Sequence, residues 1–281
     1  MKKKPIDVGI AMVFIVFALW TLAPLIFMAI SSLKVSGEIF AIPRPRDWVG
    51  FLNWFRFEPT LYHFHIIFSK GQYLLYLRNS VLLTLVTTAI AVPLGFFTSY
   101  GLSRAKLPGK ENIYFWVITT RMAPPVLVLV PLYFLFRDLH LLQTFHGMVL
   151  AYTTFSLPFA IWLLRGFIDA IPIQLEEAAR IDGLSRFRVV TDIVLPLIRP
   201  GLGACVMLVA LLVWNDYLFA LILGGRGIKT LTVAITELES ASGIYWGQIM
   251  AGGIVLVVPM IIFGLLVRRH IVKGLTMGTL E

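Results

Sequence analysis

Six long apolar stretches constrain the fold of this chain more than any other feature of its sequence. A helix needs about 20 apolar residues, at about 1.5 Å per residue, to cross a hydrocarbon core roughly 30 Å thick. The stretches cover residues 8–30, 81–100, 113–136, 147–164, 201–223 and 247–267. The sequence therefore predicts an all-α integral membrane protein with six transmembrane helices.

The composition agrees with a chain whose main solvent is lipid. Of the 281 residues, 58% are hydrophobic and 14% are charged, whereas a soluble domain has about 25% charged residues. So few charges do not cover a soluble globule. The first apolar run follows Lys2–Lys4 but is too long for a signal peptide and lacks a small-residue cleavage site, so we expect it to be retained. We expect one membrane domain over residues 1–281.

The distribution of basic residues predicts the orientation. An even number of spans places both termini on one side, and that side's segments carry more Lys and Arg than the opposite loops. Because basic residues favour the cytoplasm, we expect both termini there. The net charge of +9 is spread over these membrane edges rather than gathered in one stripe, so it does not indicate a nucleic-acid partner.

One charged segment, QLEEAARIDGLSRFRVVTDIVLPL at 174–197, interrupts the apolar pattern. Pro172 suits the first turn of a helix, and Gly183 suits the left-handed position that ends one. Ser185 is a plausible N-cap for a second helix, which we expect to stop before Pro196. The pattern predicts a cytoplasmic helix-turn-helix at 172–196, between spans four and five. On periodicity alone, an ordinary amphipathic helix lying on the membrane surface is equally possible.

The chain has no recognisable nucleotide site of its own. The stretch LGGRGIKT at 223–230 is glycine-rich, but it lacks the GxxxxGK[ST] spacing and no strand is expected before it. If ATP powers transport, another subunit must bind it.

The charged segment at 174–197 resembles that of a known family, the permease subunits of ABC importers. Its EAA-x3-G-x9-I-x-LP motif is complete in this chain, at Glu177, Ala178, Ala179, Gly183, Ile193, Leu195 and Pro196. The stretches PLIRPGL, WNDYLFAL and VKGLTMG, with the six spans, are similar to the carbohydrate-uptake branch and to the six-span permease of maltose importers. The resemblance implies a prokaryotic inner-membrane location.

The resemblance also implies partners and roles. ATPase coupling would involve Glu177, Ala178, Ala179, Asp182 and Gly183, and a tail contact would involve Gly274, Leu275, Thr276 and Gly278. Glu177 would bind a basic group of the ATPase, while the alanines and the glycine allow close packing and the turn. The partners would be a second permease, two cytoplasmic ATPases that hold ATP and Mg, and an extracytoplasmic binding protein that delivers a sugar or sugar-like solute. The chain itself would be no enzyme and would hold no cofactor or metal.

Polar residues in the predicted fifth span form a candidate substrate path. A carboxylate at membrane depth costs roughly 2.5–3.5 kcal/mol, so Asp216 needs a partner or a watery cavity. Asn215 and Asp216 would line the path, with Trp214 and Tyr217 offering flat faces to a sugar. The alternative is an interhelical hydrogen bond that only fixes packing.

Arg121 is the second costly residue, near the middle of the predicted third span. Pro124 and Pro125 are expected to kink the helix just beyond it. Arg121 would either contact substrate or form a structural ion pair, with Asp216 or with the partner permease. A rival function from another class is an ion-gradient-driven secondary transporter that uses Asp216 and Arg121 as a relay. That function leaves the charged segment unused.

Overall fold

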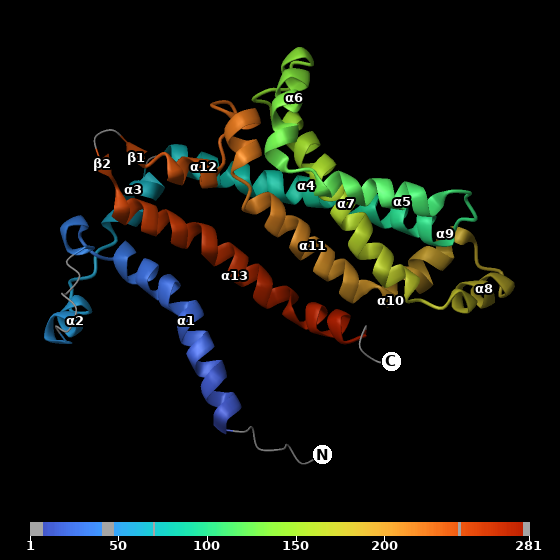
Figure 1. The fold of residues 1–281 in the computed structure, drawn as a ribbon, viewed down its shortest axis with the longest axis horizontal. Coiled ribbons are helices and arrows are strands. Elements are labelled where there is room, and N and C mark those ends of the chain that lie inside the picture. The colour runs from blue at the N-terminus through green and yellow to red at the C-terminus, as the bar shows by residue number, and fades with distance from the viewer. Residues whose placement is uncertain (1–7, 41–47, 70, 241–242, 278–281) are drawn as a thin grey trace. The chain divides into compact units, whose positions relative to one another are not determined.

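The chain is almost entirely helical in the computed structural model, which describes residues 8–40, 48–69, 71–240 and 243–277 (Figure 1). Its α-helices are α1 Val8–Ser32, α2 Trp48–Trp54, α3 Tyr62–Ser69, α4 Gly71–Arg104, α5 Lys110–Thr119, α6 Pro125–Asp138, α7 Phe145–Asp169, α8 Ile173–Ile181, α9 Arg186–Val189, α10 Leu195–Leu197, α11 Arg199–Trp214, α12 Leu231–Thr236 and α13 Trp246–Met277. Short 3-10 turns cover Ser36–Glu38 and Thr120–Met122, and π-helical turns cover Val190–Val194 and Ala220–Gly224. A two-residue hairpin pairs β1 Glu239–Ser240 with β2 Gly243–Ile244. The helical fold class predicted from the sequence is confirmed.

Among the described residues, four single helices are long and apolar enough to cross a membrane: Gly9–Ser32, Gln72–Arg104, Phe145–Asp169 and Trp246–Leu265. Two bent helix pairs raise the number to as many as six if each pair counts as one span, by length and composition alone. The predicted stretches 8–30, 81–100, 147–164 and 247–267 each fall within one of the long helices. Helix α4 begins at Gly71, ten residues before the predicted start of span two at residue 81.

The third predicted span is not one helix. Its halves, Lys110–Met122 and Pro125–Asp138, meet at 95°. Proline has no N–H for the helix ladder and forces the preceding residue towards extended conformations. Ala123 and Pro124 accordingly adopt ψ angles of 124° and 127°. The kink expected at the two prolines is therefore a full change of direction.

The fifth predicted span, 201–223, is wrong as a continuous helix. Helix α11 ends at Trp214, and the chain leaves the helical conformation before a separate turn at Ala220–Gly224. Asn215 and Asp216 favour helix termini because their side chains compete for backbone hydrogen bonds. Asp216 accepts a hydrogen bond from the Ala220 backbone N–H at 3.1 Å, which supports a new helical turn after the break.

The structure divides into two compact units. The first contains residues 1–74 and 234–258. In this unit Lys34 is only 2% exposed, and its Nζ donates to the Trp54 carbonyl oxygen at 2.6 Å and lies 3.6 Å from the centre of the Trp54 ring. Burial lowers the pKa of Lys34, and nearby Glu38 opposes that change. The segment between α1 and α4 thus has buried contacts of its own.

The second unit contains residues 75–233 and 259–281, and its described core lies around α4, α7 and α11. Helices α7 and α11 pack against each other and are labelled side by side in Figure 1. The Ser99 hydroxyl on α4 lies 2.6 Å from the Gly95 carbonyl oxygen and 2.9 Å from the Ile161 carbonyl oxygen of α7. Small and hydroxyl-bearing residues of this kind let membrane helices approach closely. This unit carries both candidate sites.

Candidate functional site

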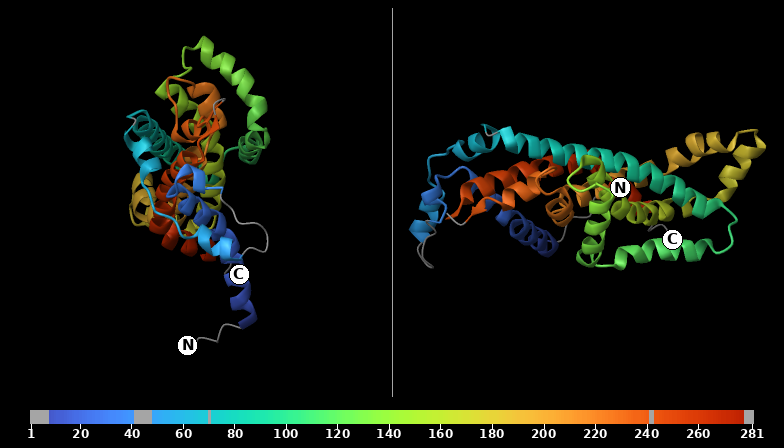
Figure 2. Two further views of the ribbon diagram at one scale, coloured as in Figure 1. Left: turned by 90° about the vertical axis from the view of Figure 1, so that its left-hand side faces the viewer. Right: turned by 90° about the horizontal axis from the view of Figure 1, so that it is seen from above.

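The charged segment forms α8 and α9 at one end of the second unit (Figures 1 and 2). Helix α8 starts after Pro172, as predicted, and Gly183 follows its end with a φ of +93°. The Gly183 N–H bonds to the Arg180 carbonyl at 3.1 Å and the Leu184 N–H to the Ala179 carbonyl at 3.0 Å. These two bonds are those of a Schellman motif. The turn therefore requires the left-handed residue that the sequence provides.

The second helix begins as predicted but does not stop where predicted. The Ser185 side chain accepts a hydrogen bond from the Arg188 backbone N–H at 3.3 Å and so caps α9. A π-helical turn and then α10 follow, and α10 contains Pro196. Pro196 lies in the first turn of α10, where proline is tolerated because its missing N–H is not needed. The expectation that the helix ends before Pro196 is wrong for this reason.

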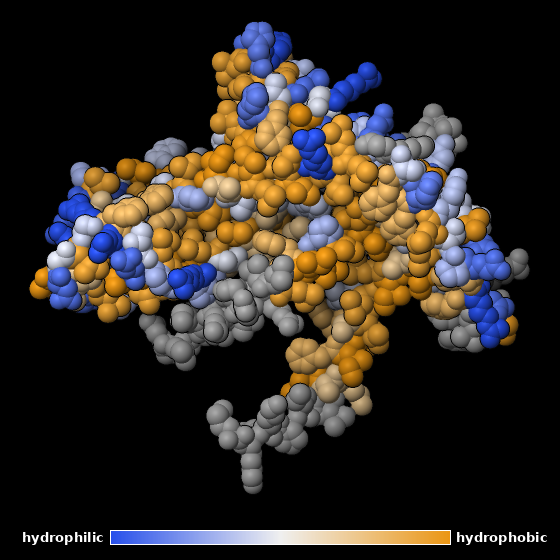
Figure 3. Space-filling view, turned by 180° about the vertical axis from the view of Figure 1, so that it is seen from behind, coloured by the Kyte–Doolittle hydropathy of each residue, from blue (hydrophilic) through white to orange (hydrophobic). Residues whose placement is uncertain are grey.

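The outer surface of α8 and α9 carries exposed residues from the motif and beside it. Glu177, Ala178 and Asp182 are exposed. Ile181 and Phe187 are 87% and 71% exposed, although both are large and apolar. Hydrophilic side chains gather at this end of the unit, on the left of Figure 3, while its middle is mainly apolar. We call Glu177, Ala178, Ile181, Asp182 and Phe187 the outer surface of the insert.

The two alanines of the motif do not share one face. Ala179 is 6% exposed and packs inward, whereas Ala178 is exposed. Successive helical residues point about 100° apart, so neighbours in sequence need not share surroundings. Only the small side chain of Ala178 can therefore let a partner approach the outer surface closely. The small side chain of Ala179 instead lets α8 pack closely against the rest of the permease. Sequence reasoning also missed the exposed apolar side chains of Ile181, which precedes the Asp182–Gly183 turn, and of Phe187 on α9.

Glu176, the residue before the motif, is buried and engaged from two sides. The Tyr100 hydroxyl donates to Oε2 at 2.8 Å, and Arg104 Nε donates to Oε1 at 2.7 Å. Arg104 Nη2 also donates to the carbonyl oxygens of Ile168 and Ile171, each at 3.0 Å. The Arg104 side chain, at the end of α4, thus contacts both the end of α7 and the inner face of α8.

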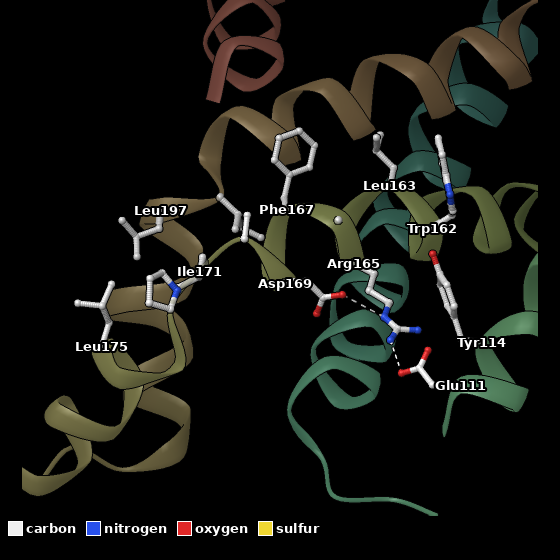
Figure 4. A pocket seen from close by; sticks show the side chains of 14 residues that line it. Glu111, Tyr114, Trp162, Leu163, Arg165, Phe167, Asp169, Ile171, Leu175 and Leu197 are labelled. Carbon is white, nitrogen blue, oxygen red and sulfur yellow. Dashed lines mark hydrogen bonds and ion pairs between the residues drawn. The ribbon is translucent and has the colours of Figure 1, made fainter. Parts of the chain in front are cut away.

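The polar contacts continue from Arg104 towards α5. Arg104 Nη1 donates to the Ser103 hydroxyl at 3.0 Å, and that hydroxyl bonds to Asp169. Asp169 accepts from Arg165 Nε at 3.2 Å, and Arg165 Nη2 contacts Glu111 Oε1 at 2.6 Å. Figure 4 shows Arg165 between these two carboxylates, beside the Tyr114 ring, at the edge of a cavity of about 820 Å³. The remaining wall of the cavity is mainly apolar.

The path residues lie around the break after α11. Asp216 Oδ2 accepts hydrogen bonds from the Tyr152 hydroxyl at 3.0 Å and from the Ala220 N–H. Trp214 is 5% exposed and belongs to the core, while Asn215 and Tyr217 are exposed. Asn215, Asp216 and Phe159 line a small cavity of about 340 Å³. Asp216 thus forms a contact with Tyr152 of α7, and the role of Trp214, Asn215, Asp216 and Tyr217 in a substrate path stays a prediction.

Arg121 lies at the break in the third predicted span, in the 3-10 turn Thr120–Met122. Its Nη1 donates to the Phe155 carbonyl oxygen at 2.9 Å, and its guanidinium lies 5.6 Å from the centre of the Phe159 ring. Among the ion pairs of the described residues, none joins Arg121 to Asp216. Arg121 and Asp216 both lie near Phe159, because Phe159 also lines the cavity beside Asp216.

The predicted tail contact falls mostly beyond what can be described. Gly274, Leu275 and Thr276 belong to the last turns of α13, and their side chains lie outside the described structure. Gly278 lies outside the described residues. The role of the tail therefore stays a prediction.

Both candidate sites lie in the part of the chain that matches a known protein family. Residues 91–277 match the family described as the binding-protein-dependent transport system inner membrane component. That match covers the charged segment, Arg121 and the residues around Asp216. The chain belongs to this family. Membership makes it a multi-pass inner-membrane permease of the ABC transporter class, as the resemblance in its sequence implied.

Relatives of this permease match over most of its length. It is 36% identical to the trehalose transport system permease protein SugB of Mycobacterium tuberculosis, over 79% of this chain and 82% of the relative. It is 30% identical to the trehalose/maltose transport system permease protein MalG of Thermococcus litoralis, over 95% and 94% of the two chains. In fold it is similar to a chain of a bacterial ABC transporter that imports alginate, with a TM-score of 0.71, 21% identity, and 94% and 95% coverage.

Proposed function

We propose that this permease is the membrane-spanning subunit of an ATP-driven importer and receives the motion of a cytoplasmic ATPase through α8 and α9. The outer surface of the insert supports this proposal most directly. It combines an exposed carboxylate at Glu177 with exposed apolar side chains at Ile181 and Phe187, in the family-matched region. Large apolar side chains at such a polar tip are costly in water and are typical of a surface that another protein covers.

The proposed complex places nucleotide chemistry on other subunits. Two ATPase subunits would bind ATP and Mg and press against the outer surface of the insert from the cytoplasm. Both termini would lie on that side, and the tail at 274–278 would reach the same interface. Glu177 would pair with a basic group of the ATPase, since exposed carboxylates at interfaces contribute specificity through such pairs. The permease would carry out no covalent chemistry.

The transport path would be shared with a second permease subunit. In this chain Asn215 and Tyr217 are exposed beside the small cavity, and Arg121 lies over the Phe159 ring on the cavity wall. An extracytoplasmic binding protein would deliver the solute. We propose a sugar or sugar-like solute because the named relatives transport trehalose or maltose and aromatic and amide side chains suit sugar hydroxyls and C–H faces.

A secondary transporter driven by an ion gradient is not favoured. Such a relay requires Asp216 and Arg121 to exchange ions or protons along a path. Asp216 is instead bonded to Tyr152 and Ala220, and Arg121 to the Phe155 carbonyl. Family membership also argues against this alternative.

Uptake into membrane vesicles tests the proposed function. Vesicles that contain both permeases and their ATPases are supplied with the cognate binding protein, whose bound ligand is first identified by mass spectrometry. We expect a carbohydrate ligand and uptake that requires ATP and persists when ion gradients are collapsed. Uptake without ATP, driven by a gradient alone, would contradict the mechanism, and a non-carbohydrate ligand would contradict the substrate class.

A further inference from the structure

Two adjacent glutamates at the start of α8 have opposite surroundings. Glu177 is exposed on the outer surface of the insert, and Glu176 is 5% exposed on its inner side. Both oxygens of Glu176 are hydrogen-bonded, one to Tyr100 and one to Arg104. A buried carboxylate without such partners is strongly unfavourable, so this arrangement favours one fixed position of α8.

Arg104 connects Glu176 to several other parts of the chain. Its planar guanidinium carries donors in a rigid fork, and here they reach Glu176, the carbonyl oxygens of Ile168 and Ile171, and the Ser103 hydroxyl. The two carbonyls lie at and just beyond the C-terminus of α7, where helices leave backbone acceptors without intrahelical partners. Arg104 thus holds α4, the end of α7 and α8 in one geometry.

The connection matters because α8 is not joined to α4 by neighbouring backbone. Glu176 is separated from Arg104 by 72 residues and from Tyr100 by 76. The chain leads into α8 from α7 through residues 170–172 and leads out of it towards α9 and α11. At this point α8 contacts α4 through side chains that are distant in sequence.

We propose that Glu176, held by Arg104 and Tyr100, is the positioning residue that makes α8 move together with α4 and the end of α7. The inference rests on the proposed function, since it concerns motion that an ATPase applies at the outer surface. Glu177 then serves the contact between subunits, and Glu176 serves transmission within the permease. The contacts from Ser103 through Asp169 and Arg165 to Glu111 extend the same connection to α5.

Matched substitutions separate the two glutamates. Glu176→Gln keeps the shape but removes the charge that Arg104 faces, and Arg104→Lys keeps the charge but loses the fork. In proteoliposomes that hold the whole transporter, we expect both variants to retain the ATPase on copurification. We expect solute uptake per ATP hydrolysed to fall about tenfold, the scale of losing one charge-assisted hydrogen bond. A ratio within twofold of wild type in an assembled Glu176→Gln complex would overturn the proposal.

Glu177→Lys is the control that tests the underlying function. We expect it to weaken ATPase retention, which the Glu176 variant leaves intact. If Glu177→Lys retains the ATPase fully, the proposed docking surface is wrong, whatever Glu176 does. If it loses the ATPase while Glu176→Gln transports with an unchanged ratio, the docking surface stands and the positioning role of Glu176 fails.

A distance measurement reports on transmission directly. Spin labels at Leu94→Cys on α4 and Gln174→Cys on α8 occupy exposed positions away from the outer surface of the insert, whereas the native Cys205 is buried. We expect one narrow distance distribution that ATP does not change, and a broad or ATP-dependent distribution after Glu176→Gln. Identical narrow distributions in both proteins would overturn the proposal. If Glu176→Gln does not assemble, Tyr100→Phe takes its place, because it removes only one hydroxyl group. Its uptake per ATP hydrolysed and its spin-label distances are then judged by the same criteria.

Discussion

Single residues set the shape of the insert, and Gly183 has the most demanding position. Its φ of +93° lies in the region that L-residues avoid, and no atom lies within 4 Å of where a Cβ would be. A substitution there is penalised by backbone conformation alone, without a steric clash. The Schellman bonds to Ala179 and Arg180 depend on that conformation.

Gly183→Ala should therefore destabilise the turn between α8 and α9 by about 1–2 kcal/mol. Gly166→Ala on α7 is the matched control, because it also has open space around its Cβ position but has no left-handed φ. We expect the control to be neutral or slightly stabilising, since alanine favours helix over glycine by about 1 kcal/mol. Thermal unfolding in detergent and ATPase retention measure both variants. Equal behaviour of the two would contradict the conformational argument.

The sequence predicted the role of a single residue only where that role depends on neighbouring residues in the chain. The motif identified Glu177 because its role would be outward and local. Glu176 gave no comparable signal, because its partners on α4 are distant in sequence and become neighbours only in the fold. Asp216 was recognised as a residue that needs a partner, but the partner Tyr152, 64 residues away, was not.

Among the helices, α4 and α7 lie close together at Gly95. A Cβ at this position would lie 2.7 Å from the Cβ of Ala160 and 3.3 Å from its backbone carbonyl carbon. Backbone cannot move aside as the end of a flexible side chain can. The Ser99 hydroxyl, which contacts the Ile161 carbonyl, needs the same short separation.

Gly95→Ala should force α4 and α7 apart and reduce stability by about 1–3 kcal/mol, the range for overpacked cores. Gly101→Ala lies on the same helix and meets nothing within 4 Å, so it is expected to be tolerated. The unfolding midpoints of the two purified variants, compared with wild type, measure the difference. A Gly95 variant as stable as the Gly101 variant would show that the two helices are not closely packed here.

Helix positions followed from the sequence where apolar length and capping residues decide them. The starts of α8 and α9 and the four long helices belong to this group. The 95° change of direction after Met122 was foreseen only as a kink, because prolines show where a helix breaks but not the angle. The end of α11 at Trp214 was missed, although Asn215 and Asp216 carried a terminus signal within the apolar stretch.

For the whole molecule, the family match identifies a permease, and the similar structure shows the same fold. The proposed mechanism states where force enters this permease and where it goes. Force would enter at the outer surface of the insert and pass through buried contacts into the spanning helices. This mechanism requires α8 and α9 to face the cytoplasm, beneath an ATPase. The excess of basic residues on the side of both termini supports that orientation.

The accessibility of position 178 tests this central claim most directly. Ala178→Cys is exposed and the native Cys205 is buried, so a membrane-impermeant maleimide should label only the introduced thiol. We predict labelling in inside-out vesicles stripped of the ATPase, none in right-side-out vesicles, and protection when the ATPase is added back. Labelling from the outer side, or labelling that the ATPase does not reduce, would contradict the account.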